Sequence, residues 1–349
     1  MPGPHDNPHT AGRRSAAAFL ERFGPLLALV LLIAGTAIVE AITVAPESRA
    51  FLTTRNFANI LGQWAFVGIV ALGMTFVIIL GGIDLSVGSM VALAAGASLY
   101  ALNGAADAWG PTPAVAVAVA VCVLTGSFMG AINGFVIAKG RLAPFVVTLG
   151  GLAIYRSLIT APAQGSEIRS SVPRFGELGQ TTVDVPLLGP DGAGLSIRLG
   201  VVVFLTLAVI AHVALTRTIF GRRVYAIGDN PRAARYAGVP IVGTTILVYT
   251  VAGFTCGVAA LLNAGRLNSV SSSSLGLFYE LDAIAAVVIG GTRLQGGSGR
   301  IFGTVLGVLI LGVVSNMLNM LGVSTFYHGL VKGLIIIAAV VIQPRKSDA

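Results

Sequence analysis

Residues 57–80 read FANILGQWAFVGIVALGMTFVIIL and contain no charged side chain. A helix of about 20 apolar residues is long enough to cross the hydrocarbon core of a bilayer. Other charge-free runs of comparable length cover residues 114–138, 199–216, 242–262 and 301–321. We therefore expect each of these runs to form a membrane-spanning helix.

The overall composition agrees with a membrane protein. Of the 349 residues, 55% are hydrophobic and 10% are charged, whereas about 25% of the residues in an ordinary soluble domain are charged. The two cysteines, Cys122 and Cys256, exclude a disulfide scaffold and a cysteine-rich metal protein. Both lie in apolar runs, so we expect them to be buried packing residues.

Shorter or interrupted apolar runs complete the expected topology. They cover residues 25–44, 87–102, 144–160, 275–291 and 326–342, which brings the prediction to about ten spans in an all-α polytopic bundle. The run at 25–44 is longer than the apolar part of a signal peptide, so we expect it to remain as an anchor.

The positive charges predict how the chain is oriented. If both termini are cytoplasmic, most Lys and Arg residues fall on the cytoplasmic side, as the positive-inside rule requires. Residues 1–22 are then a loose cytoplasmic tail, 23–342 form the transmembrane domain and 343–349 form a second tail. We then expect the loop 217–241 to be cytoplasmic and the loop 161–198 to lie on the outer side.

Two loops share the pattern GGxxLxxG. The first is GGIDLSVG at residues 81–88 and the second is GGTRLQGG at residues 290–297. We interpret them as marks of two duplicated halves, a common way to build transporters, although chance repetition in a chain with 45 glycines is the alternative.

Other glycines repeat every fourth residue and predict close helix packing within the bundle, with dimerisation as the alternative. They are Gly126, Gly130 and Gly134, then Gly253 and Gly257, then Gly303 and Gly307.

The sequence lacks the usual signatures of an energy source. It contains no phosphate-binding GK[ST], no HExxH and no GxSxG. Charges that would mark proton or ion coupling are nearly missing from the spans, since only Glu40, Arg156 and Lys332 come near, towards the outer ends. We therefore expect no catalytic residue, metal site or cofactor in this chain, and any energy for uphill transport must come from another subunit.

The loop 217–241 is a candidate entry point for that energy. Asp229 or Asn230 can cap a short helix that begins at Pro231, and Gly238 with Pro240 can end it. A short helix on the cytoplasmic face suits the groove of a partner protein. The alternative is a basic helix lying on anionic lipid.

Four motifs in this order resemble the permease subunits of bacterial sugar ABC importers of the ribose/xylose type. They are GGIDLSVGS at 81–89, TLGG at 148–151, GDNPRAARYAG at 228–238, and VIGGT at 288–292 with GGSG at 296–299. The resemblance implies a subunit of the cytoplasmic membrane that pairs with a second permease copy, homo- or heterodimeric. It also implies two cytoplasmic ATPase subunits that bind ATP and Mg, and a periplasmic or lipid-anchored binding protein that delivers a monosaccharide.

The resemblance also assigns roles to residues. It implies that the segment coupled to the ATPase contains Gly228, Asp229, Asn230, Pro231, Arg232, Ala233, Ala234, Arg235 and Gly238. The signature loops contain Gly81, Gly82, Asp84, Ser86, Gly88, Gly290, Gly291 and Gly297. For Asp84, a helix cap and a gate are both compatible with the sequence.

Uncharged polar residues in the spans are candidates for the translocation path. They are Gln63, Asn133, Thr148, Tyr155, Asn316 and Asn319. Each could equally form a hydrogen bond between helices. The interrupted runs at 144–160 and 275–291 point to a route near the midplane of the membrane.

Several alternatives stay open at this stage. A self-sufficient secondary transporter or channel is the main alternative, and a membrane enzyme is disfavoured by the missing catalytic residues. The loop 161–198 could meet the binding protein or be an idle solvated loop. The sugar itself and the roles of His328 and Lys332 are not specified by the sequence.

Overall fold

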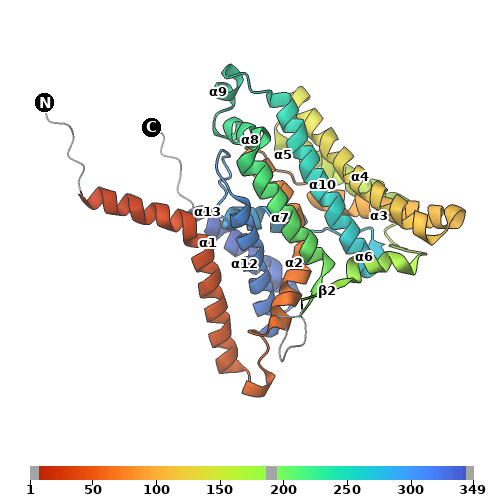
Figure 1. Cartoon of the computed structure of the whole chain (residues 1–349), viewed down its shortest axis with the longest axis horizontal. Coiled ribbons are helices and arrows are strands. Elements are labelled where there is room, and N and C mark those ends of the chain that lie inside the picture. The colour runs from red at the N-terminus through yellow and green to blue at the C-terminus, as the bar shows by residue number, and fades with distance from the viewer. Residues whose placement is uncertain (1–7, 186–194, 343–349) are drawn as a thin grey trace.

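The computed structural model describes residues 8–185 and 195–342, and these form a bundle of long helices (Figure 1). Eight helical segments in the described part are long and apolar enough to cross a membrane. They are Phe23–Thr43 of α1 (Pro8–Thr43), α2 (Thr54–Ile79), α3 (Val87–Trp109), α4 (Pro111–Gly140), α5 (Pro144–Ala163), α7 (Leu199–Arg217), α10 (Ile241–Leu267) and α12 (Ile301–Met320). The expected multi-span helical fold is confirmed at this level.

Two further helices occupy the remaining apolar runs. The first, α11, covers Tyr279–Ile289 and has 11 residues, which at 1.5 Å per residue reaches only about half of a ~30 Å hydrocarbon core. The run expected at 275–291 therefore contains a half-length helix, because residues 272–278 form turns instead. The second, α13, covers Thr325–Ile342. The count of ten crossings stays a prediction.

The N-terminal segment differs from the loose tail expected at residues 1–22. Helix α1 already begins at Pro8, so most of that segment is helical. Alanines at positions 11 and 16–18 favour a helix, because alanine has the highest helix propensity of any residue.

Helix α2 is the centre of the bundle. Every residue from Trp64 to Ile79 is buried, which explains why this run needs no polar stripe. Helices α7, α10, α11 and α12 all pack against it. The largest fully buried side chains include Phe76, Ile69 and Leu72 of α2 and Tyr249 of α10.

Glycines bring α4 and α10 into backbone contact, and Figure 1 shows the two helices side by side. A Cβ atom added to Gly130 would overlap the carbonyl oxygen of Tyr249, and one added to Gly253 would overlap that of Gly126. The glycine spacing therefore serves packing inside the bundle, as expected. The Cys122 thiol donates to the Gly257 carbonyl across the same contact (3.3 Å), and both cysteines are buried.

Short strands and turns close one end of the bundle. Strand β1 (Glu167–Arg169) pairs with β4 (Ser269–Ser271) in antiparallel register, Ile168 opposite Val270. Strand β2 (Thr182–Val185) pairs with β3 (Leu195–Arg198), and η2 (Pro173–Gly176) with α6 (Glu177–Gln180) lies between β1 and β2. The described part of the loop 161–198 is thus ordered, with Phe175 fully buried, while Asp191 of that loop lies outside the described residues.

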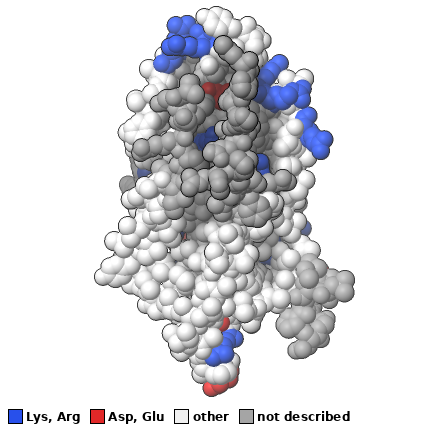
Figure 2. Space-filling model, turned by 90° about the vertical axis from the view of Figure 1, so that its left-hand side faces the viewer, with Lys and Arg blue, Asp and Glu red and all other residues white. Residues whose placement is uncertain are grey.

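The connections expected on the cytoplasmic side gather at the opposite end. The amide of Gly297 in the α11–α12 loop donates to the carbonyl of Ile79 at the end of α2 (2.9 Å). Arg141 of the α4–α5 turn and Arg235 of the 217–241 loop line one cavity. Figure 2 shows groups of Lys and Arg atoms at this end, the top of the view, and a smaller group beside acidic atoms at the lower tip.

The α4–α10 contact leads to a first prediction. Gly130→Ala should destabilise the protein, because the new methyl group must push two helix backbones apart, a type of overpacking that typically costs about 1–3 kcal/mol. A lower midpoint of thermal unfolding in detergent would be the measured effect.

The matched control is Gly243→Ala, which adds the same methyl group to α10 where nothing lies within 4 Å. That variant should unfold at or slightly above the wild-type temperature, because alanine is the better helix former. Equal unfolding temperatures for the two variants would contradict the packing role of Gly130.

Candidate functional site

The loop 217–241 forms two short helices that project from the end of the bundle (Figure 1). They are α8 (Ile219–Asp229) and α9 (Pro231–Tyr236). The Asn230 side chain caps α9 by accepting from the amides of Arg232 (3.1 Å) and Ala233 (3.0 Å). Gly238 ends it in a left-handed conformation, φ +75°. The structure therefore confirms the cap and the stop read from the sequence, and adds a second helix in front of them.

The segment 219–238, which contains α8 and α9, contacts the rest of the bundle at Gly228. A Cβ atom on Gly228 would overlap the carbonyl oxygen of Ile79 and would lie 2.6 Å from the amide nitrogen of Gly297. The hydroxyl of Tyr225 donates to the carbonyl of Gly299 (2.7 Å). The end of α8 is thus wedged between the end of α2 and the α11–α12 loop.

We call this contact the glycine joint, formed by Ile79–Gly81, Gly228–Asp229 and Gly296–Gly299. A Cβ atom on Gly296 would lie 3.0 Å from the Cα of Gly81, and one on Gly297 would lie 2.8 Å from the Cα of Asp229. Because backbone meets backbone here, no flexible side chain can absorb a displacement of α8. The segment 219–238 is therefore in direct backbone contact with both signature loops.

The two signature loops end their preceding helices in the same way. The structural match, however, is shifted by one residue relative to the alignment of the two GGxxLxxG patterns. Gly81 (φ +91°) and Gly291 (φ +88°) are the left-handed residues that follow α2 and α11. The next amides, of Gly82 and Thr292, both reach back five residues, to Val77 and Val287. Structurally, then, Gly81 matches Gly291 and not Gly290. The shared feature is a helix stop of the Schellman type, and duplication of the two halves stays a prediction.

Asp84 sits in a buried polar cluster with Ser86, Asn133, Thr148 and Tyr155. Its Oδ1 accepts from the amide (2.8 Å) and the hydroxyl (2.6 Å) of Ser86. Asn133 donates to the Ser86 hydroxyl (2.9 Å) and accepts from the Tyr155 hydroxyl (2.8 Å). The Thr148 hydroxyl lies 3.3 Å from the carbonyl of Ile83. The cluster therefore fixes the non-helical segment 80–86 against α4 and α5.

The second carboxyl oxygen of Asp84, Oδ2, is buried and has no hydrogen-bond partner in the described part of the chain. Burial raises the pKa of Asp84 from its ordinary value of 3.8, and the hydrogen bonds from Ser86 oppose that rise. A neutral carboxyl avoids the large free energy of burying an unpaired charge. Asp84 therefore closes a turn on Ser86, which is itself the N-cap of α3 and has no side-chain cap hydrogen bond. The helix cap expected at Asp84 is not seen, and the gate stays a prediction.

Charged residues also lie deeper in the bundle than the sequence suggested. Lys332 of α13 contacts both carboxylate oxygens of Asp282 in α11 (2.9 and 3.0 Å) and lies 4.9 Å above the ring of Trp64. Arg156 of α5 donates to the carbonyls of Ser272 (3.2 Å) and Leu275 (2.9 Å). Arg156 is thus bonded to the turn that precedes α11. The sequence analysis missed Asp282 because the run at 275–291 was expected to be interrupted.

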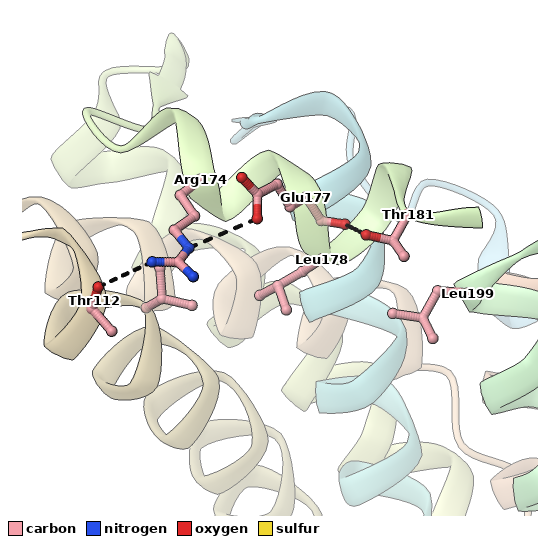
Figure 3. Close-up of a pocket in the computed structure, with 7 residues that line it drawn as sticks. Thr112, Arg174, Glu177, Leu178, Thr181 and Leu199 are labelled. Carbon is pink, nitrogen blue, oxygen red and sulfur yellow. Dashed lines mark hydrogen bonds and ion pairs between the residues drawn. The ribbon is translucent and has the colours of Figure 1, made fainter. Parts of the chain in front are cut away.

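A shallow pocket of about 310 Å³ opens at the end opposite the glycine joint (Figure 3). Arg174 crosses it, 3.3 Å from the Thr112 hydroxyl and 3.8 Å from the Glu177 carboxylate. Its rim is solvent-exposed and lies at the end that holds the loop 161–198, so it is separate from the joint.

The comparisons with known proteins identify the family. Residues 56–340 match the family model described as the permease component of the branched-chain amino acid transport system. The chain belongs to this permease family. It is 39% identical to the ribose import permease protein of Bacillus subtilis (strain 168) over 328 residues, 94% of each chain.

Two further relatives come from Escherichia coli (strain K12). The permease is 38% identical to that organism's ribose import permease protein over 340 residues, 96% of this chain and 98% of the relative. It is 33% identical to the xylose transport system permease protein over 341 residues, 83% of this chain and 85% of the relative. The resemblance read from the four motifs is thus confirmed.

The six path candidates of the permease fall into three groups. Asn133, Thr148 and Tyr155 join the Asp84 cluster. Asn316 exchanges amide hydrogen bonds with Asn56 of α2 (3.0 and 3.1 Å). Gln63 and Asn319 are exposed on the surface of the single chain. The first four thus have the hydrogen-bonding role that the sequence offered as the alternative, and a path role stays untested for all six.

The Asp84 cluster leads to a second prediction, which concerns pH. A carboxyl whose pKa is raised on folding keeps its proton in the folded state when the unfolded state has already lost it. Its contribution to stability is therefore full below its ordinary pKa and is lost as the pH rises. Asp84→Asn lacks this loss, so its free energy of unfolding should rise relative to that of the wild type as the pH increases above about 4, by about 1.4 kcal/mol for each unit of pKa shift.

Thermal unfolding in detergent at a series of pH values measures this difference. Asp107→Asn, which removes an exposed carboxylate from α3, controls for the change in net charge. If the wild type instead gained stability over Asp84→Asn with rising pH, a charged Asp84 would be the favoured form and the neutral assignment would be wrong.

Proposed function

We propose that this permease is the membrane-spanning subunit of an ATP-binding-cassette importer that carries a monosaccharide, of the ribose or xylose kind, across the cytoplasmic membrane. The relatives named as ribose and xylose permeases over most of their length support the substrate class. The observation that carries the mechanism is the glycine joint, which connects a projecting segment to both signature loops without intervening side chains.

The projecting end of α9 has the chemistry of a docking site. Tyr236, its last residue, is 93% exposed, and Arg232 and Arg235 are exposed on the same helix. An exposed tyrosine beside arginines is the composition typical of interface anchors. We propose that a separate ATPase subunit binds here, with its nucleotide and Mg held on that subunit.

In this mechanism, ATP binding and hydrolysis move the ATPase, which displaces α8 and α9. The joint passes this displacement to the end of α2 and to the α11–α12 loop. These elements hold the Asp84 segment on one side and the half-length helix α11 on the other. A rigid-body shift at the joint can therefore change the packing of the elements that surround the route.

The other partners follow from the same proposal. A second permease copy completes the route, and a periplasmic or lipid-anchored sugar-binding protein delivers the sugar to the end that holds the loop 161–198. Both chain termini are then cytoplasmic, since the glycine joint and its basic surface lie on that side by the positive-inside rule.

Reconstitution tests the function. The purified chain in liposomes should accumulate no labelled ribose or xylose, whereas the chain with its ATPase and sugar-binding protein should do so when ATP is supplied. Sugar movement by the chain alone, without ATP, would instead establish a self-sufficient transporter or channel.

A charge reversal tests the docking surface. Arg232→Glu combined with Arg235→Glu should release the ATPase in a detergent pull-down, because two like-charged contacts replace favourable ones, while membrane insertion is unchanged. Undiminished ATPase retention would exclude α9 as the docking site.

Arg55→Glu is the control for that pull-down, since Arg55 is exposed at the opposite end of the bundle. It should leave ATPase retention at the wild-type level. Release of the ATPase by Arg55→Glu, with retention by the double variant, would place the ATPase at the end of the bundle opposite α9. That result would overturn the proposed orientation.

A further inference from the structure

The segment before α11, residues 272–278, leads from the β1–β4 end of the bundle towards the middle of the membrane. Helix α11 has 11 residues and rises about 16 Å, and its far end leads into the glycine joint. Phe278, the N-cap of α11, is therefore near the middle of a ~30 Å hydrocarbon core.

This segment is neither helical nor covered by the chain. Residues 272–278 form turns, and Ser273, Ser274, Leu277 and Phe278 are exposed. Irregular backbone at this depth is tolerated only where it packs in protein or lines a water-filled cavity, because hydrocarbon cannot satisfy its polar groups. The exposed side of 272–278 therefore does not face lipid.

Several contacts hold the segment in place. Arg156 donates to the carbonyls of Ser272 and Leu275, and the Ser272 hydroxyl donates to the carbonyl of Ser166 (2.8 Å). Gly276, in a left-handed conformation (φ +74°), meets the backbone of Gly88 so closely that a Cβ on either would overlap the other. The turn is thus a built feature and not a loose connection.

Phe278 has a conformation that bulky residues rarely adopt. Its φ is +65° and its ψ is +8°, in the left-handed region, where non-glycine residues store strain. Its side chain is nevertheless 63% exposed, so burial of the ring does not repay that strain within the chain. Such strain persists where a function requires the position of the side chain.

We propose that Phe278, together with the hydroxyls of Ser273 and Ser274, contacts the sugar in the translocation route. An aromatic face offers apolar area to the C–H face of a sugar ring. The Ser273 hydroxyl can both donate to and accept from sugar hydroxyls, whereas the Ser274 hydroxyl donates to Ser271 (2.7 Å) and can accept. We expect this contact with the sugar to be weak, since residues 273–278 would cover only one side of the sugar. This proposal rests on the proposed function, because it names the residues that would meet the same sugar.

Thiol labelling tests whether Phe278 faces water. A Phe278→Cys variant should react with a charged, membrane-impermeant methanethiosulfonate reagent, because only the thiolate reacts and it forms only in a polar environment. The native Cys122 and Cys256 are fully buried and give little background. The matched control is Leu205→Cys, on α7, where the side chain is 46% exposed among apolar neighbours.

We expect the Phe278→Cys variant to react at least about tenfold faster than Leu205→Cys in the assembled transporter. Equal rates would overturn the assignment of this segment to an aqueous route. This measurement requires no sugar, so its result does not depend on which solute the permease carries.

Transport tests the sugar contact itself. In the transporter reconstituted with its ATPase and binding protein, Phe278→Ala should lower the sugar moved per ATP hydrolysed severalfold, and Phe278→Tyr should keep it near the wild-type value. An alanine variant with wild-type sugar per ATP would overturn the contact. Failure of the wild-type assembly to move sugar would instead contradict the proposed function, while the labelling comparison would still judge the position of Phe278.

Discussion

The structure depends on one constraint of the bilayer: hydrocarbon offers no partner for a backbone amide or carbonyl and no hydrophobic drive between helices. The permease meets it by bringing backbones into contact through glycine. Gly126, Gly130 and Gly253 do so between α4 and α10, and Gly228 with Gly297 do so at the end of α8. At these contacts no side chain separates the backbones, which is the basis of the proposed transmission of a displacement from the surface to the interior.

Two stretches of the bundle are not helical, and their backbone polar groups need partners other than those of a helix. Residues 80–86 are enclosed by protein, and the Asp84 cluster satisfies Ile83, Ser86 and their neighbours with side-chain hydrogen bonds. Residues 272–278 are held on one side by Arg156 and Gly88 and are open on the other. One irregular segment is thus part of the core, while the other has a free side only where water or another protein surface can meet it.

The glycine joint and the α11 half-helix form one continuous unit. The loop that follows α11 supplies Gly296 and Gly297 to the joint, and the turn that precedes α11 carries Phe278. A helix of 11 residues therefore connects the proposed docking segment to the proposed sugar contact. Asp282, in the first turn of α11, forms an ion pair with Lys332 of α13. A movement of α11 would therefore also affect α13.

The sequence predicted those features that depend on local order along the chain. Long charge-free runs became helices, Asn230 and Gly238 capped and stopped α9, and four motifs gave the family. Features that depend on residues distant in the chain were missed. No local signal indicates that Asp282 would find Lys332, that Arg156 would hold a turn more than a hundred residues away, or that Asn316 would pair with Asn56.

The sequence alone determined that the chain is a membrane protein with several spans and that it has the motifs of a sugar permease. These features could be read from the sequence because the length of an apolar run, the distribution of charge and the capping residues depend only on residues close together in the chain. The tertiary structure decided which glycines meet, which polar candidates are satisfied inside the bundle and where backbone stays open at depth. Those outcomes depend on the three-dimensional approach of segments far apart in the chain, which helical periodicity does not encode.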